Sequence, residues 1–177
     1  VDAANTLGSV RGQEMRRVVP VLLEATEDRD PHVRAAAIRA VGNVIRLNLP
    51  TFGDEMAGEV AAATPRVTAA LGDKVASVRT AAVMTLASLH VPKVPDPSTP
   101  QGFVPQPGLS YGPFGPQHED AVPLLDRALR DSDPEVRAEA CMTYREFLDV
   151  RDDVPESVIA ALLHDPSMDV RGAAAST

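Results

Sequence analysis

The chain has 177 residues, of which 44% are hydrophobic and only 3% aromatic, so it is long enough to bury a continuous core built mainly from Ala, Val and Leu. Its formal net charge is −8, which argues against a nucleic-acid partner and against a membrane-surface role, because both draw affinity from clustered Lys and Arg. No apolar run is long enough to cross a bilayer, and one cysteine excludes an internal disulfide.

A short phrase occurs four times along the chain. In each copy an aspartate stands five residues before a valine and six residues before the arginine that follows it. Self-similarity of this kind is the signature of a repeat architecture. The four copies are Asp28 with Val33 and Arg34, Asp73 with Val78 and Arg79, Asp131 with Val136 and Arg137, and Asp165 with Val170 and Arg171.

Each unit predicts a helix, an Asp-rich turn and a second helix. A proline stands fourteen residues before each of the first three arginines, at Pro20, Pro65 and Pro123. Small and apolar residues follow each Val-Arg pair at helical spacing. The pairs Asp30-Pro31 and Asp133-Pro134 place a capping acid before a proline in the first turn of the second helix, where a missing N–H costs little.

The ends of the chain indicate incomplete units. Residues 3–10 align with residues 37–44, so the chain begins inside a second helix. It ends at Thr177, seven residues past Val170, which cuts the last second helix short. A terminal repeat normally carries a polar outer face, and neither end shows one. We therefore expect one solenoid over residues 1–177 that is a fragment of a longer array.

The repeats are unequally spaced, with 45, 58 and 34 residues between successive arginines of the phrase. The first excess fits a connection at residues 49–53 and a lengthened first helix near residues 54–71. The second excess is a Pro- and Gly-rich loop over residues 92–117, which holds half of the chain's 16 prolines. We call this loop the arm.

The arm also holds Phe103, Tyr111 and Phe114, half of the chain's six aromatic residues. One interpretation is that the rings attach the arm to the side of the solenoid. The other is that they form or cover a binding site, because long irregular loops on a rigid scaffold often carry function.

The phrase resembles the hallmark D-x-D-P-x-V-R-x-A-A of the HEAT-repeat family, in its short bacterial-type, phycobilisome-lyase-like variety. The match is close at residues 28–37 and 131–140, looser at 73–82 and partial at 165–174. The resemblance implies an all-α fold, a right-handed α-solenoid of stacked helix pairs. It also implies a structural ladder of ion pairs between neighbouring repeats, formed by Asp28, Asp73, Asp131 and Asp165 with Arg34, Arg79, Arg137 and Arg171.

In such a solenoid the second helices line the concave side. The positions after the paired alanines would then form a largely apolar column, made of Ile38, Arg39, Val83, Met84, Cys141 and Met142. If exposed, this column would suit an amphipathic helix or an extended peptide. Packing between repeats would instead bury several of its members, and the sequence leaves both alternatives open.

No catalytic, cofactor-binding or metal-binding residues are assigned. The four histidines have no spacing that places two of them on one metal, and no Gly-rich phosphate loop or Gly-x-Ser-x-Gly elbow occurs. We therefore do not expect an enzyme. The leading hypothesis is a binding or scaffolding module for a protein or peptide, held by the groove, the arm or both. The alternative, implied by the lyase-like resemblance, is an accessory factor for an enzyme or for chromophore attachment.

Overall fold

The computed structural model describes residues 1–89, 118–148 and 156–176. Within them the chain forms nine α-helices and two short 3-10 helices, and no strand. The helices are α1 (Asp2–Leu7), α2 (Met15–Ala25), α3 (Pro31–Phe52), α4 (Ala57–Ala70), α5 (Ala76–Leu89), α6 (His118–Ala128), α7 (Pro134–Leu148), α8 (Glu156–His164) and α9 (Met168–Ala175). The 3-10 helices are η1 (Gly12–Glu14) and η2 (Gly53–Met56). The arm, residues 92–117, lies outside the described residues.

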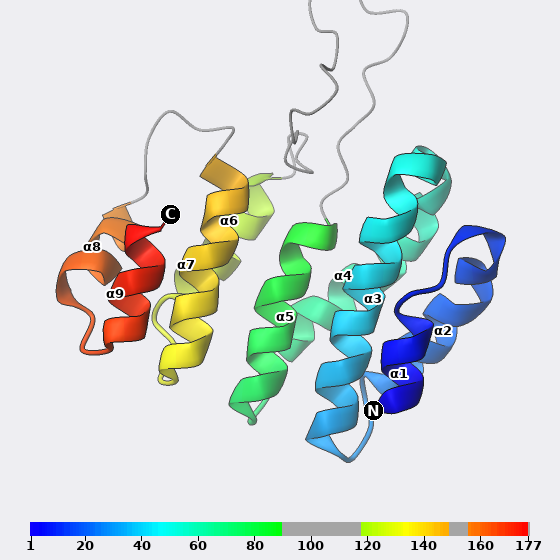
Figure 1. Cartoon of the computed structure of the whole chain (residues 1–177), viewed down its shortest axis with the longest axis horizontal. Helices are drawn as coiled ribbons and strands as arrows, with labels where there is room; N and C mark the ends of the chain where they lie inside the picture. The colour runs from blue at the N-terminus through cyan, green and yellow to red at the C-terminus, as the bar shows by residue number, and fades with distance from the viewer. Residues whose placement is uncertain (90–117, 149–155, 177) are drawn as a thin grey trace, which may run out of the picture.

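The helices stack in two layers, as expected of an α-solenoid (Figure 1). The second helices α3, α5, α7 and α9 lie side by side in chain order, and α1 lies beside α3. The first helices α2, α4, α6 and α8 form the other layer. The order of the helices therefore follows the order of the repeats in the sequence.

The turn chemistry expected from the sequence is confirmed at two helix starts. The Asp30 carboxylate accepts the His32 amide at 2.8 Å, and α3 begins at Pro31. The Asp133 carboxylate accepts the Glu135 amide at 2.9 Å, and α7 begins at Pro134. Each side chain satisfies one of the N–H groups that a helix start leaves without an intrahelical partner.

The repeated prolines lie inside α2, α4 and α6. Pro20, Pro65 and Pro123 are all exposed. A proline within a helix removes one backbone hydrogen bond. On the outer side of the helix the carbonyl that loses its partner has access to water, so this position limits the cost.

One expected boundary differs from the structure. Residues 49–53 were expected to form a connection, but α3 continues to Phe52 and η2 follows it directly. The fully buried Met56 of η2 belongs to the core, and η2 packs against α3. The extra residues of the first long interval therefore lengthen a second helix and its return, which adds apolar contact that an exposed connection would lack.

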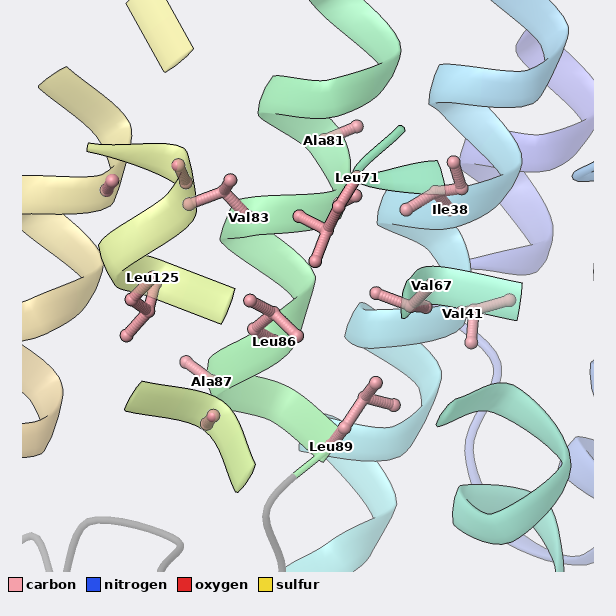
Figure 2. Packing of buried hydrophobic residues seen from close by; sticks show 14 of the residues in the cluster. Ile38, Val41, Val67, Leu71, Ala81, Val83, Leu86, Ala87, Leu89 and Leu125 are labelled. Carbon is pink, nitrogen blue, oxygen red and sulfur yellow. The ribbon is translucent and has the colours of Figure 1, made fainter. Parts of the chain in front are cut away.

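The core is continuous through the stack and consists mainly of small and aliphatic side chains. Figure 2 shows part of it between α3, α5 and α6, with Ile38 and Val41 on α3 and Leu86 on α5. All three are at most 2% exposed. Complete burial of one such side chain contributes roughly 1.5–3 kcal/mol to the free energy of unfolding.

Helices α3 and α5 approach closely because Gly42 has no side chain. A methyl group at Gly42 would lie 2.9 Å from Thr85 Cγ2, closer than packed carbon atoms normally come. The Thr85 hydroxyl lies 2.8 Å from the Ala81 carbonyl and 3.2 Å from the Ile38 carbonyl, so it connects the two helices.

No described helix is both long and apolar enough to span a membrane.

Candidate functional site

The four turns between first and second helices have the same internal geometry. In each turn the Oδ1 atom of the leading aspartate accepts the backbone N–H two residues later, at 2.8 or 2.9 Å. The pairs are Asp28 with Asp30, Asp73 with Val75, Asp131 with Asp133, and Asp165 with Ser167. A short acidic side chain is suited to this turn because it bonds the backbone locally.

The repeated arginine closes the turn from its other side. Nη1 of Arg34 donates to the Asp28 carbonyl at 2.8 Å, and Nη1 of Arg79 donates to the Asp73 carbonyl at 2.9 Å. Arg137 and Arg171 make the same bond within their own turns, at 2.8 and 2.7 Å. One end of each guanidinium is therefore fixed within its own repeat.

The opposite edge of the guanidinium reaches the next repeat. Nε and Nη2 of Arg34 donate to the two carboxylate oxygens of Asp73, at 2.9 and 3.0 Å. Arg79 bonds Asp131 in the same way, at 2.8 and 2.7 Å, and Arg137 bonds Asp165 at 2.7 and 2.9 Å. Paired, parallel N–H bonds of this kind fix orientation as well as position. These three pairs are the rungs of the ladder.

Two of the eight ladder residues have no such partner among the described residues. Asp28 is exposed, and no arginine side chain contacts its carboxylate. Arg171 donates only to the backbone carbonyls of Asp165 and Pro166. The structure therefore brings together six of the eight residues in three rungs.

The rungs are largely shielded from solvent, with side chains between 8% and 15% exposed. The Arg137 guanidinium lowers the pKa of Asp165, although burial opposes the shift. At Asp73 and Asp131, burial alone would raise the pKa, but the arginine and backbone N–H bonds outweigh it and lower the pKa. These carboxylates stay ionised and are fully engaged as hydrogen-bond acceptors.

The expected apolar column is not exposed along its whole length. Ile38, Val83 and Cys141 are 0% exposed and belong to the core, so the expectation is corrected at these positions. Successive residues of an α-helix point about 100° apart, so two consecutive residues do not share one face. Burial also raises the pKa of the Cys141 thiol to about 11, which leaves it protonated at neutral pH.

The other half of the column faces outward. Met84 on α5 is 45% exposed and Met142 on α7 is 47% exposed. Arg39, at the matching position on α3, is also exposed. These three residues lie on consecutive, adjacent helices, and we call them the outer row. Phe103, Tyr111 and Phe114 of the arm lie outside the described residues, so their role stays a prediction.

Sequence reasoning missed a polar cluster that connects three helices near the end of the stack. The Tyr144 hydroxyl on α7 and the Ser157 hydroxyl on α8 each lie 2.7 Å from Oδ1 of Asp126 on α6. Tyr144 is only 1% exposed. The sequence signal that points to it is Tyr144 itself, an aromatic residue on a second helix of a chain that is only 3% aromatic.

Two parts of the chain match known family models. Residues 18–47 match a model described as HEAT repeat, and residues 112–177 match one described as HEAT repeats. Comparison with curated proteins gives no match. In the described ranges no three His, Cys, Asp or Glu side chains are grouped so that they could hold a metal ion. The chain therefore contains HEAT repeats, consistent with the turns and rungs of the structure.

Proposed function

We propose that this chain, a stack of HEAT repeats, is a protein-interaction or scaffolding module that holds a protein or peptide against its outer row. Stacked helical repeats form extended surfaces that suit this role. The observation that carries the proposal is the exposure of Met84 and Met142 at the same position of adjacent second helices. Large apolar side chains repeated along one face suit a partner with apolar residues.

Methionine favours such a surface because its side chain is unbranched and polarizable, so it adapts to partners of different shape. A row of two methionines on α5 and α7, continued by Arg39 on α3, fits an amphipathic helix or an extended segment that crosses the second helices. The arm is part of the proposal as a second contact through Phe103, Tyr111 and Phe114.

The charge around the outer row indicates an acidic partner. Arg39, Arg46 and Arg145 are all exposed on α3 and α7. None of them forms an ion pair with a described residue. Arg46 donates to Asn43 Oδ1 at 3.3 Å but, like the other two, pairs with no described carboxylate. In a chain of net charge −8, three such guanidinium groups on one layer favour carboxylates on the partner and raise the association rate. The accessory role in chromophore attachment has no comparable support among the described residues.

The test places a photo-reactive amino acid at position 84 or 142 and identifies crosslinked proteins from host lysate by mass spectrometry. Matched controls carry it at Val21 or Ile159, exposed apolar positions on first helices. We expect a shared set of acidic partners at positions 84 and 142, absent at the controls and depleted by excess unmodified chain. Equal crosslinking on both layers, or none at 84 and 142, would contradict the proposal. Deletion of residues 93–115 then tells whether the arm contributes.

A further inference from the structure

A cavity of about 450 Å³ lies between the first helices of the second and third repeats. It is bounded by the end of α4, the start of α5, the last turns of α6 and the turn before α7. None of the outer-row residues belongs to its lining, and the helices that bound it can be followed in Figure 1. Its lining consists of Leu71, Gly72, Arg79, Val83, Leu124, Arg127, Ala128, Arg130, Asp131, Ser132 and Val136.

The cavity exists because two side chains that close the preceding junction are replaced. Between the first and second repeats, Glu27 at the end of the first helix forms an ion pair with Arg66 of α4. In the repeat register, Gly72 takes the place of Glu27 and Leu124 takes the place of Arg66. Both replacements line the cavity. A glycine and a leucine cannot form the ion pair, and together they leave the space between α4 and α6 open.

The entrance to this cavity is cationic. The Arg127 side chain is exposed and has no hydrogen bond or ion pair with a described residue, and among these residues the Arg130 side chain donates only to the Asp126 carbonyl, at 3.1 Å. Arg79 already donates two hydrogen bonds to the Asp131 carboxylate in the rung. The lining thus holds three arginines against one aspartate. The guanidinium groups of Arg127, in the last turn of α6, and of Arg130, two residues after the end of α6, form no ion pair with a described residue.

Part of the cavity's lining is aliphatic, and Leu124 of α6 is its most exposed aliphatic side chain. Val83 is 0% exposed, Val136 is 1% exposed, and Leu71 and Ala128 are also buried. Figure 2 shows Val83 pointing from α5 toward α6. Ligand sites of about 300–1,000 Å³ combine aliphatic surface with a few polar groups that fix orientation, and this cavity offers some of each.

We propose that the cavity binds an organic anion in which a carboxylate is attached to a short aliphatic body. The carboxylate lies between Arg127 and Arg130, where guanidinium groups match its geometry. The aliphatic body lies against Leu124, the half-buried aliphatic side chain of the lining. Such a ligand is either a free small molecule or an acidic segment of a polypeptide, and the chemistry is the same.

Amide chemical shifts of the full chain, labelled with ¹⁵N, test the proposal with defined probes. Hexanoate supplies both the charge and the aliphatic body, hexanamide lacks the charge, and inorganic phosphate lacks the body. We expect hexanoate to shift the amide signals of Gly72, Val83 and Ser132 in a saturable way, with the other two probes at least about fivefold weaker at equal ionic strength. Saturation by hexanamide or phosphate at the same concentration would overturn the proposal.

Two variants and a matched control connect the signal to the site. The double variant Arg127→Gln with Arg130→Gln should weaken the binding of hexanoate by about fivefold or more. The control Arg11→Gln with Arg17→Gln changes the net charge equally and should leave the binding of hexanoate unaltered. Both of those control arginines are exposed and far along the chain from the cavity. Unaltered binding in the first pair, or equal loss in both pairs, would show that the cavity does not hold the anion.

A third variant fills the site without removing an arginine. Gly72 lies outside the left-handed region of backbone conformation, and a Cβ there would meet only the Ala69 carbonyl, at an ordinary 3.5 Å. Gly72→Glu should therefore fold and place its own carboxylate near Arg127 and Arg130, in competition with hexanoate. A blocked peptide, acetyl-Ala-Leu-Glu-Leu-Ala-amide, assigns the ligand class: tighter binding than hexanoate indicates a polypeptide, and weaker binding a free small molecule. Undiminished hexanoate binding in Gly72→Glu would count against the site.

Discussion

Two junctions between repeats can be compared, one between the first and second repeats and one between the second and third. They differ on the layer of the first helices. On the second-helix layer each has a paired rung, Arg34 with Asp73 in the first and Arg79 with Asp131 in the second. On the other layer the first junction is crossed by Arg66–Glu27, and the second holds the cavity. The comparison indicates that the rung sets the stacking of the repeats, which leaves the first-helix layer free to diverge.

The largest effect is expected where the rung has the least support. Arg79→Ala leaves the Asp131 carboxylate largely buried without its partner, so we expect the free energy of unfolding to fall by roughly 1–3 kcal/mol. Arg34→Ala should cost less, because Arg66–Glu27 and the ion pair of Arg16 with Glu55 still cross the first junction. Urea unfolding followed by circular dichroism measures both.

The control for this pair is Arg171→Ala, because among the described residues the Arg171 side chain bonds only backbone carbonyls of its own turn. It should be the mildest of the three substitutions. A larger loss for Arg34→Ala than for Arg79→Ala would refute the idea that the first junction has additional support. Unchanged stability in all three variants would remove the structural role of the ladder.

The rungs also predict how stability depends on pH. Arginine bonding holds the pKa of Asp165 below its ordinary value, and outweighs burial to do the same at Asp131 and Asp73. A carboxyl with a lower pKa in the folded state stabilises the fold fully above its unfolded pKa of about 3.9, and this stabilisation is lost as the pH falls through the folded pKa. We therefore expect stability to decline below about pH 4.

Substitution separates the rungs from general acid effects. Asp131→Asn removes one titrating rung and should make the loss of stability between about pH 5 and pH 3 shallower. Asp28→Asn is the matched control, since no arginine side chain in the described part of the chain contacts the Asp28 carboxylate, and the slope should change less than in Asp131→Asn. Equal slopes in Asp131→Asn and the unmodified chain would contradict the assignment of the acid sensitivity to this rung.

Much of the fold follows from local signals in the sequence. The caps at Asp30 and Asp133 depend on neighbouring residues only, and they form as expected. Which member of a consecutive pair faces outward was not predictable in the same way, because the burial of Ile38 and Val83 depends on how neighbouring helices pack and not on local sequence. The handedness of the superhelix stays a prediction.

The cavity was missed for a different reason. The phrase contains only what the repeats share, whereas the cavity arises from positions where the repeats differ. Gly72 against Glu27 and Leu124 against Arg66 are visible once the arginines are aligned. Their meaning appears only when α4 and α6 are known to be neighbours across a junction, since the two residues are far apart in the chain. Three-dimensional adjacency supplied what the aligned sequence alone could not.

The smallest effect concerns the ion pair that distinguishes the first junction. Arg66 and Glu27 are 42% and 67% exposed, so solvent screens their attraction and the pair is worth about 0–1 kcal/mol. A double-mutant cycle with Arg66→Gln and Glu27→Gln, at low and high salt, measures the coupling directly. A coupling free energy within that range, weaker at high salt, would mean that the ion pair adds little stability. Its two side chains would then act mainly by filling space at the junction. A larger, salt-insensitive coupling would show that both layers hold the first junction, and that the cavity marks a weaker one.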